Sequence, residues 1–152
     1  MGVDYKQLTK WQQDLQKLND EQIDEFIRSC CKELAVRLLR KVVKRTPSNT
    51  GTLRKGWTAG QSASAYVNSL NISKSGNNYH IDIINPVEYA SYVEYGHRQT
   101  PGRYVPALGK RLKQGWCPGR FMLTISEQEI NSSTDKILQA KLNKYMKDVF
   151  KV

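Results

Sequence analysis

Few side chains in this sequence have the types and spacing that catalysis requires. Glu88 and Glu94 are the only acids between Asp82 and Glu127. His97 could be imagined as a general base, but no nucleophile lies near it in the sequence, so a surface histidine is the simpler interpretation. Because a carboxylate cluster for a catalytic metal is also missing from the pattern, we expect a non-enzymatic protein.

A phosphate loop and a metal site are excluded on spacing. In segment 51–56, GTLRKG, the second glycine is followed by Trp57, whereas a P-loop continues with Lys and then Ser or Thr. Cysteines 30, 31 and 117 are odd in number, and the first two are adjacent, which argues against a disulfide framework and for a reducing compartment. His80 and His97 lie far from any cysteine pair, so a zinc site lacks its ligands. We therefore expect no cofactor and no metal.

The segment 97–120 is the most distinctive part of the chain. It is rich in Gly and Pro, contains the aromatic residues Tyr104 and Trp116, and has no Asp or Glu. Its basic residues are Arg98, Arg103, Lys110, Arg111, Lys113 and Arg120. We predict a long flexible basic loop that contacts DNA or an acidic protein partner, since Arg and aromatic residues anchor interfaces and aromatic rings stack on bases.

The net charge of +10 points to a negatively charged partner but does not identify it. A second basic run lies within a predicted helix and consists of Arg37, Arg40, Lys41, Lys44 and Arg45. It has two interpretations: a solvated polar face, which we favour because amphipathic helices normally carry one, and an electrostatic track for phosphates.

The elements that would position these residues form one domain, 1–152. Apolar residues recur at helical spacing from Ile23 to Val42, which predicts a long amphipathic helix over 20–46 with Asn19 as N-cap and Pro47 after its end. A weaker stripe predicts a peripheral helix within residues 1–18. No apolar stretch is long enough to span a bilayer, and no signal peptide is evident, so we expect synthesis in the cytosol and no membrane contact.

The middle of the chain reads as β structure. Residues 66–73 and 79–84 alternate in polarity around the turn 75–78, which predicts a hairpin. A short helix over 87–95 is expected to end at Gly96. From Phe121 onward the pattern is helical, with residues 132–134 either a break or a polar patch within one helix. The predicted fold class is α+β: a long amphipathic helix and a C-terminal helix packed on a small, mainly antiparallel sheet, with a long basic loop.

Two motifs in this order resemble a known family. Thr46-Pro-x-x-Thr-Gly-x-Leu-Arg54 directly follows the long helix, and Tyr89-Ala-x-Tyr-Val-Glu-Tyr-Gly96 follows the predicted hairpin. The order is similar to that of the tail-component family of siphophages and related prophages, and the resemblance extends from Ile23 to Ile125. Segment 98–119 departs from the family pattern, because it is longer and more basic than a compact member requires.

The resemblance implies a structural subunit of the virion, in the tail or neck, that acts in tail completion or head–tail joining. It would assemble in the host cytoplasm, contact other neck and tail proteins, and form a ring around the DNA passage, although it could be monomeric when isolated. The motif residues implied at partner interfaces are Thr50, Gly51, Leu53, Arg54, Tyr89, Tyr92, Glu94, Tyr95 and Gly96. Glu94 would pair with a basic group of this or the next subunit, with Arg54 as one candidate, and we expect that replacing either residue would damage assembly more than folding.

The alternative is a stand-alone basic protein that binds nucleic acid. It accounts for the charge and the basic aromatic segment, but the chain contains no recognised nucleic-acid-binding motif. Salt dependence separates the two hypotheses, because phosphate binding weakens steeply as salt rises.

Overall fold

The computed structural model describes residues 20–48 and 50–150. The helix predicted within residues 1–18 and the predicted N-cap Asn19 lie outside these ranges. The described elements are α+β, which confirms the predicted fold class. No described helix is both long and apolar enough to cross a membrane.

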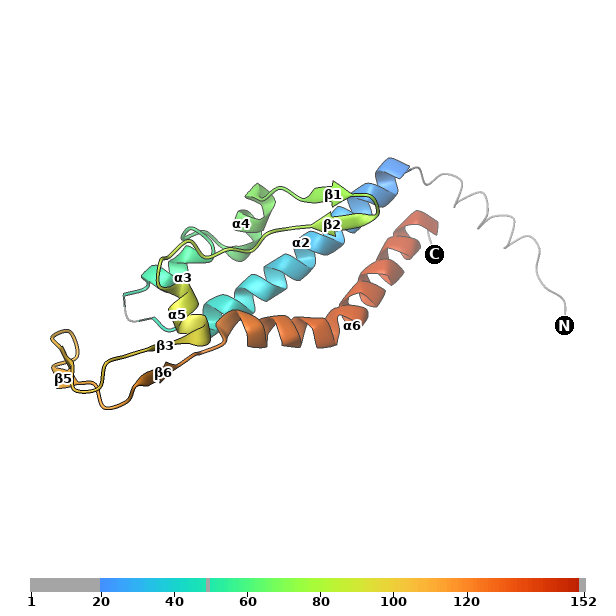
Figure 1. Ribbon diagram of the computed structural model, residues 1–152. Coiled ribbons are helices and arrows are strands. Elements are labelled where there is room, and N and C mark those ends of the chain that lie inside the picture. Colours follow the sequence, from blue (N-terminus) through green and yellow to red (C-terminus); the bar gives the residue numbers. More distant parts are fainter. Residues whose placement is uncertain (1–19, 49, 151–152) are drawn as a thin grey trace, which may run out of the picture.

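Two long helices form the body of the protein. Helix α2 (Asp20–Arg45) agrees with the predicted long helix and ends two residues before Pro47, since the residue preceding a proline disfavours helical geometry. Helix α6 (Met122–Phe150) lies along α2 (Figure 1). The rings of Phe26 and Tyr145 stack with centroids 4.4 Å apart, so the two helices are in contact far from the buried core.

The C-terminal helix is continuous through residues 132–134, so the polar-patch alternative is correct. The hydroxyls of Ser133 and Thr134 donate to the Ile130 carbonyl at 3.2 and 2.7 Å, and Ser132 donates to the Glu129 carbonyl at 2.8 Å. Such back-bonding bends helices, and α6 bends partway along its length in Figure 1.

The core lies where α2, α6 and the middle segment meet. Its buried members are Ala35, Leu39, Val42, Leu53, Trp57, Val67 and Met122. Leu39, Val42, Val67 and Met122 are fully buried. Each such side chain stabilises the fold by about 1.5–3 kcal/mol through removal from water.

The predicted strand at 66–73 is wrong. Residues Ala63–Ser69 form helix α4, whose N-cap Ser62 accepts a hydrogen bond from the Ala65 N–H at 3.2 Å. Tyr66, Val67 and Leu70 also fit a helical face, and the cap decides between the two patterns because it satisfies a free N–H at the helix start. The hairpin exists but is shorter than predicted: β1 (Ser73–Ser75) pairs with β2 (Asn78–His80), and residues 81–84 have no strand partner in the described chain.

Two short helices carry the motif residues. Helix α3 (Thr52–Gly56) follows α2, and helix α5 (Ala90–Tyr95) confirms the predicted short helix. Gly96 ends α5 with φ 85°, a left-handed value that glycine adopts without strain.

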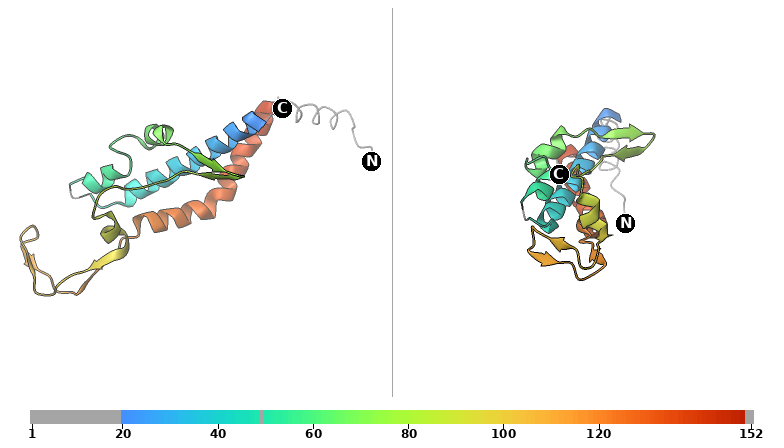
Figure 2. Two further views of the ribbon diagram at one scale, coloured as in Figure 1. Left: turned by 45° about the horizontal axis from the view of Figure 1, so that its top comes forward. Right: turned by 60° about the vertical axis from the view of Figure 1, so that its left-hand side comes forward.

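Segment 97–120 is not an irregular loop. Strand β3 (Gly96–Arg98) pairs with β6 (Trp116–Pro118), and further out β4 (Tyr104–Val105) pairs with β5 (Lys110–Arg111), both antiparallel. We call residues 96–118 the arm. It projects from one end of the body in Figure 1 and in the left-hand view of Figure 2. The described strands therefore form three separate two-stranded antiparallel sheets, and helix α2 contacts α6 and α4 as well as the β1–β2 hairpin.

Ion pairs join the elements at the edge of the core. Lys41 and Arg45 of α2 both bind Glu129 of α6, and Lys141 of α6 binds Glu33 of α2 at 2.9 Å. Asp24 accepts a hydrogen bond from the Tyr79 hydroxyl at 2.6 Å and so ties α2 to the β1–β2 hairpin.

These contacts predict that the folded protein becomes less stable at acidic pH. The hydrogen bonds from Tyr79 and then Arg28 lower the pKa of Asp24 to about 2, and Lys41 and then Arg45 lower the pKa of Glu129. A carboxylate whose folded pKa is depressed contributes stability that is present above its unfolded pKa and is lost as pH falls through the folded value. We expect the urea concentration at the midpoint of unfolding to stay constant near neutral pH. It should fall as the pH is lowered from about 4 towards 2. An unchanged midpoint at pH 2.5 would contradict this expectation.

Candidate functional site

Thr46 is the junction between α2 and α3 in the first motif. Its buried hydroxyl donates to the Val42 carbonyl at 2.7 Å and accepts from the Trp57 indole N–H at 2.8 Å. The Arg54 guanidinium donates to the Thr46 carbonyl at 2.8 Å and so satisfies an acceptor at the end of α2. The motif therefore fixes the angle at which the chain leaves the long helix.

The rest of the first motif turns the chain and is anchored to the turn that precedes the second motif. Gly51 adopts φ 79° at the start of α3, and Leu53 points into the core. The Asn85 amide donates to the Leu53 carbonyl at 2.9 Å, and the Asn85 side-chain oxygen accepts from the Val87 N–H at 3.1 Å. A Cβ at Gly56 would collide with Asn85, so glycine is required for this approach.

The two motifs meet around one pocket of about 290 Å³. Its lining comes from the first motif (Pro47, Thr50, Gly51 and Leu53) and from the second (Tyr89 and Val93). Segments that are far apart in the sequence therefore build one surface. Residues Thr50 and Tyr89 on the rim are exposed, whereas Leu53 is buried and supports the surface from within.

The predicted pair between Glu94 and Arg54 is wrong. Glu94 is only 6% exposed, and its carboxylate accepts hydrogen bonds from the N–H groups of Leu123 and Thr124 at 2.9 and 2.8 Å. It also accepts from the Thr124 hydroxyl at 2.7 Å. A carboxylate at a helix N-terminus satisfies its free N–H groups and interacts favourably with the helix dipole. Glu94 therefore holds α5 onto the start of α6, and its side chain is not available to a neighbouring subunit.

Two glycines allow the arm to leave the body. A Cβ at Gly96 would lie 2.5 Å from the Cys117 carbonyl oxygen, and one at Gly119 would collide with backbone atoms of residues 94–96. The N–H groups of Arg120 and Phe121 donate to the carbonyls of Val93 and Glu94 at 2.7 and 3.0 Å. Gly96 therefore lets two chain segments approach closely at the root of the arm, where a side chain would not fit.

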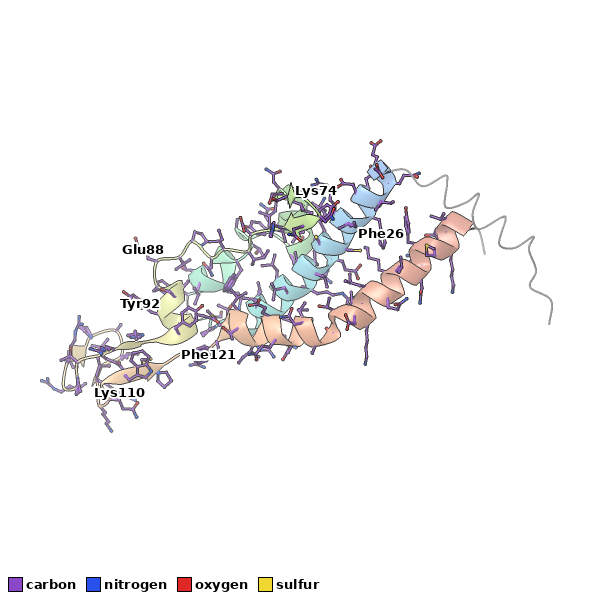
Figure 3. The ribbon with its side chains drawn as sticks, turned by 45° about the vertical axis from the view of Figure 1, so that its right-hand side comes forward. Phe26, Lys74, Glu88, Tyr92, Lys110 and Phe121 are labelled. Atoms are coloured by element: carbon purple, nitrogen blue, oxygen red, sulfur yellow. The ribbon has the colours of Figure 1, made fainter. Side chains whose placement is uncertain are left out.

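Three tyrosines of the second motif form the exposed side of α5. Tyr89, Tyr92 and Tyr95 are 43%, 58% and 63% exposed, and their spacing of three residues places them along one ridge. We call them the tyrosine ridge. Figure 3 labels Tyr92 on α5 and Phe121 at the start of α6, both near the base of the arm.

Sequence reasoning missed several exposed apolar side chains near these elements. Ile84 precedes α5, Phe121 precedes α6, and Tyr104, Leu108 and Trp116 lie on the arm; all are at least 42% exposed. Of these, Tyr104 and Trp116 are the two aromatic residues that the sequence already indicated as interface or base-stacking residues, whereas Ile84, Leu108 and Phe121 were not predicted to be exposed. No sequence pattern marks Ile84 or Phe121, because an isolated apolar residue does not reveal whether it faces the core or solvent.

The six basic residues predicted to contact a partner are all exposed. Five of them lie on the arm, and Arg120 lies at its root. By contrast, the basic run on α2 is largely engaged within the subunit: Arg37 binds Glu33, and Lys41 and Arg45 bind Glu129. The α2 run therefore serves helix packing more than it offers a track for phosphates.

Deleting residues 99–114, with a short glycine linker in their place, is expected to leave the melting temperature nearly unchanged. No arm residue belongs to the buried core cluster, so the deletion removes little buried apolar surface. Differential scanning fluorimetry of the native and shortened proteins measures this directly. A drop of more than about 4 °C would correspond to roughly 1 kcal/mol or more and would place the arm in the cooperative core.

The surfaces of the described chain do not suggest a metal centre, since residues 20–48 and 50–150 contain no group of three or more His, Cys, Asp or Glu side chains that could hold an ion. The pocket between the motifs is lined by hydroxyl, backbone and apolar groups. Such a lining suits packing against another macromolecule better than acid–base chemistry.

Comparison with models of known protein families gives a match. The family described as "Bacteriophage HK97-gp10, putative tail-component" matches residues 10–96, which include both motifs and end where the arm begins. Searches of the curated proteins and of the solved structures found no match. Because the family match covers more than half of the chain, the protein belongs to the HK97-gp10-like family of phage tail components.

Proposed function

We propose that this protein is a non-enzymatic structural subunit of a phage virion that acts in tail completion or head–tail joining, and that it works there as one copy in a ring. The observation that carries the proposal is the tyrosine ridge on α5, whose side chains are exposed although α5 itself is fixed to the body. Tyrosine is enriched at protein interfaces because its ring contributes contact area at a low entropic cost.

The anchoring of α5 explains how such a surface would be kept in shape. Glu94 joins α5 to α6 through three hydrogen bonds, and Asn85 joins the preceding turn to α3. A ridge held on both sides is preorganised, so little conformational entropy is lost when a partner binds. The adjoining pocket between the motifs, with a volume of about 290 Å³, adds a concavity that could receive a partner's side chains.

A ring needs a heterologous interface, in which one face of a subunit binds a different face of the next. The tyrosine ridge and the pocket supply one face of this interface. The face that binds them belongs to the neighbouring copy or to another neck or tail protein. Arg54 is half-buried and bound to Thr46, so we assign it to the support of this surface and not to direct contact.

The test is the protein content of purified virions. Particles banded in a density gradient are analysed by quantitative mass spectrometry, with the portal and the major tail protein as internal standards. We expect the chain in every particle at a fixed copy number that fits a ring. Absence from the particles, or a variable trace amount, would contradict the proposal.

A further inference from the structure

The arm differs from the body in how its charge is balanced. All its charged side chains are basic, namely Arg98, Arg103, Lys110, Arg111 and Lys113, and all five are exposed. No ion pair within the described chain involves any of them. Arg111 donates to the Gly102 carbonyl at 2.8 Å, which stiffens the arm without neutralising it.

The body, by contrast, neutralises much of its own charge. Arg28 and Lys74 share Asp24, Lys41 and Arg45 share Glu129, and Arg37 and Lys141 share Glu33. Half of the net charge of +10 therefore lies on the arm, as five basic side chains with no acid among them, and the arm extends away from the described body (Figure 1). A projecting cluster of one sign attracts a polyanion over about a Debye length.

The shape of the arm fits the same partner. It is a two-stranded ribbon, and outside its paired strands it is closed by backbone hydrogen bonds such as Gly102 N–H to the Leu112 carbonyl at 2.7 Å. Two-stranded ribbons are marginally stable alone in water and are narrow enough to enter the major groove of duplex DNA. Contact with DNA would supply the stabilisation that the arm lacks.

We propose that the arm binds the phosphate backbone of duplex DNA without sequence preference, through Arg103, Lys110, Arg111 and Lys113. The choice of duplex DNA rests on the proposed function, because a ring in the neck or tail would surround the passage through which the DNA leaves the virion. The contact itself rests on the arm's own residues, which lie beyond the segment matched by the family.

The experiment compares two triple variants that remove equal charge. The arm variant is Lys110→Gln, Arg111→Gln, Lys113→Gln, and the control is Lys55→Gln, Lys136→Gln, Lys144→Gln, all three of which are exposed on the body. Binding of the full chain to labelled duplexes of two unrelated sequences is followed by fluorescence anisotropy across a salt series. Melting temperatures of both variants are measured in parallel, and we expect them to equal that of the native protein.

The native chain should bind both duplexes alike, with affinity falling steeply as salt rises. At low salt, the DNA affinity of the arm variant should be roughly tenfold or more below that of the native chain. The plot of log binding constant against log salt concentration should also be shallower, by about 0.9 for each lost phosphate contact. The control should stay within about threefold of native. Equal losses of DNA affinity in the two variants would overturn the inference. So would binding by the native chain that does not change with salt concentration.

Complementation of a phage lacking the gene separates this inference from the proposed function. An arm variant that binds DNA normally but fails to restore infectious particles would mean that the arm contacts a protein, which overturns the DNA inference and leaves the virion role intact. An arm variant that loses DNA binding, in a phage whose particles form normally without the gene, would support the DNA contact and remove the virion role.

Discussion

Replacing Glu94 by alanine is expected to lower the free energy of unfolding by about 2–3 kcal/mol. The change leaves two N–H groups and one hydroxyl at the start of α6 without the buried carboxylate that accepts their hydrogen bonds. It also removes a negative charge from the positive end of the helix dipole. Chemical denaturation of the isolated subunit measures the loss.

Two controls make the Glu94 result specific. Glu94→Gln keeps an acceptor oxygen but not the charge. Its loss in the free energy of unfolding should therefore be smaller than that of Glu94→Ala but still measurable. Glu88→Ala removes an exposed acid just before α5 and should leave the stability within about 0.5 kcal/mol of native. If Glu94→Ala instead folds as stably as the native protein and fails only in assembly, Glu94 acts at an interface, as the motif alone had suggested.

Replacing Tyr92 and Tyr95 together by serine is expected to abolish assembly while leaving the subunit folded. The two rings are more than half exposed, so the fold loses little when they are removed. If each ring contributes about 2 kcal/mol to a partner contact, the double change weakens that contact roughly a thousandfold. The titre of infectious particles, with the variant supplied to a phage lacking the gene, is the measurement.

The matched control for the tyrosine ridge is Tyr92→Phe, Tyr95→Phe, which keeps both rings and removes only the hydroxyls. We expect it to restore most of the titre, because ring burial supplies most of the contact energy. A serine variant that gives native titres would show that the ridge is not an assembly surface. A serine variant that melts far below the native protein would mean that Tyr92 and Tyr95 support the fold instead.

The helices could be predicted because their signals are long and local. Helix α2 repeats its apolar spacing over many turns and ends before Pro47, and Gly96 ends α5 as expected. The strand predicted for residues 66–73 rested on the moderate alternation of Val67, Leu70 and Ile72, but Val67 and Leu70 are also spaced as in one turn of a helix. The cap made by Ser62 settles the choice, and a capping hydrogen bond cannot be recognised from a short apolar run alone.

The sequence predicted which residues form the site but not what each of them does. The motif sequence places Glu94 beside exposed tyrosines, and only the packing of α6 shows that its side chain is turned inward. The partner of Arg54 is a backbone carbonyl, which sequence patterns do not encode. Segment 97–120 was expected to be irregular because of its Gly and Pro content, yet its pairing places Gly102 and Gly109 at turns with positive φ.

The most direct test of the virion-assembly role is electron microscopy of a lysate from a phage or prophage that lacks this gene. We expect separate filled heads and tails, or tails of abnormal length, and the defect that appears identifies the joint that the protein completes. Normal, complete virions in that lysate would contradict the proposed function.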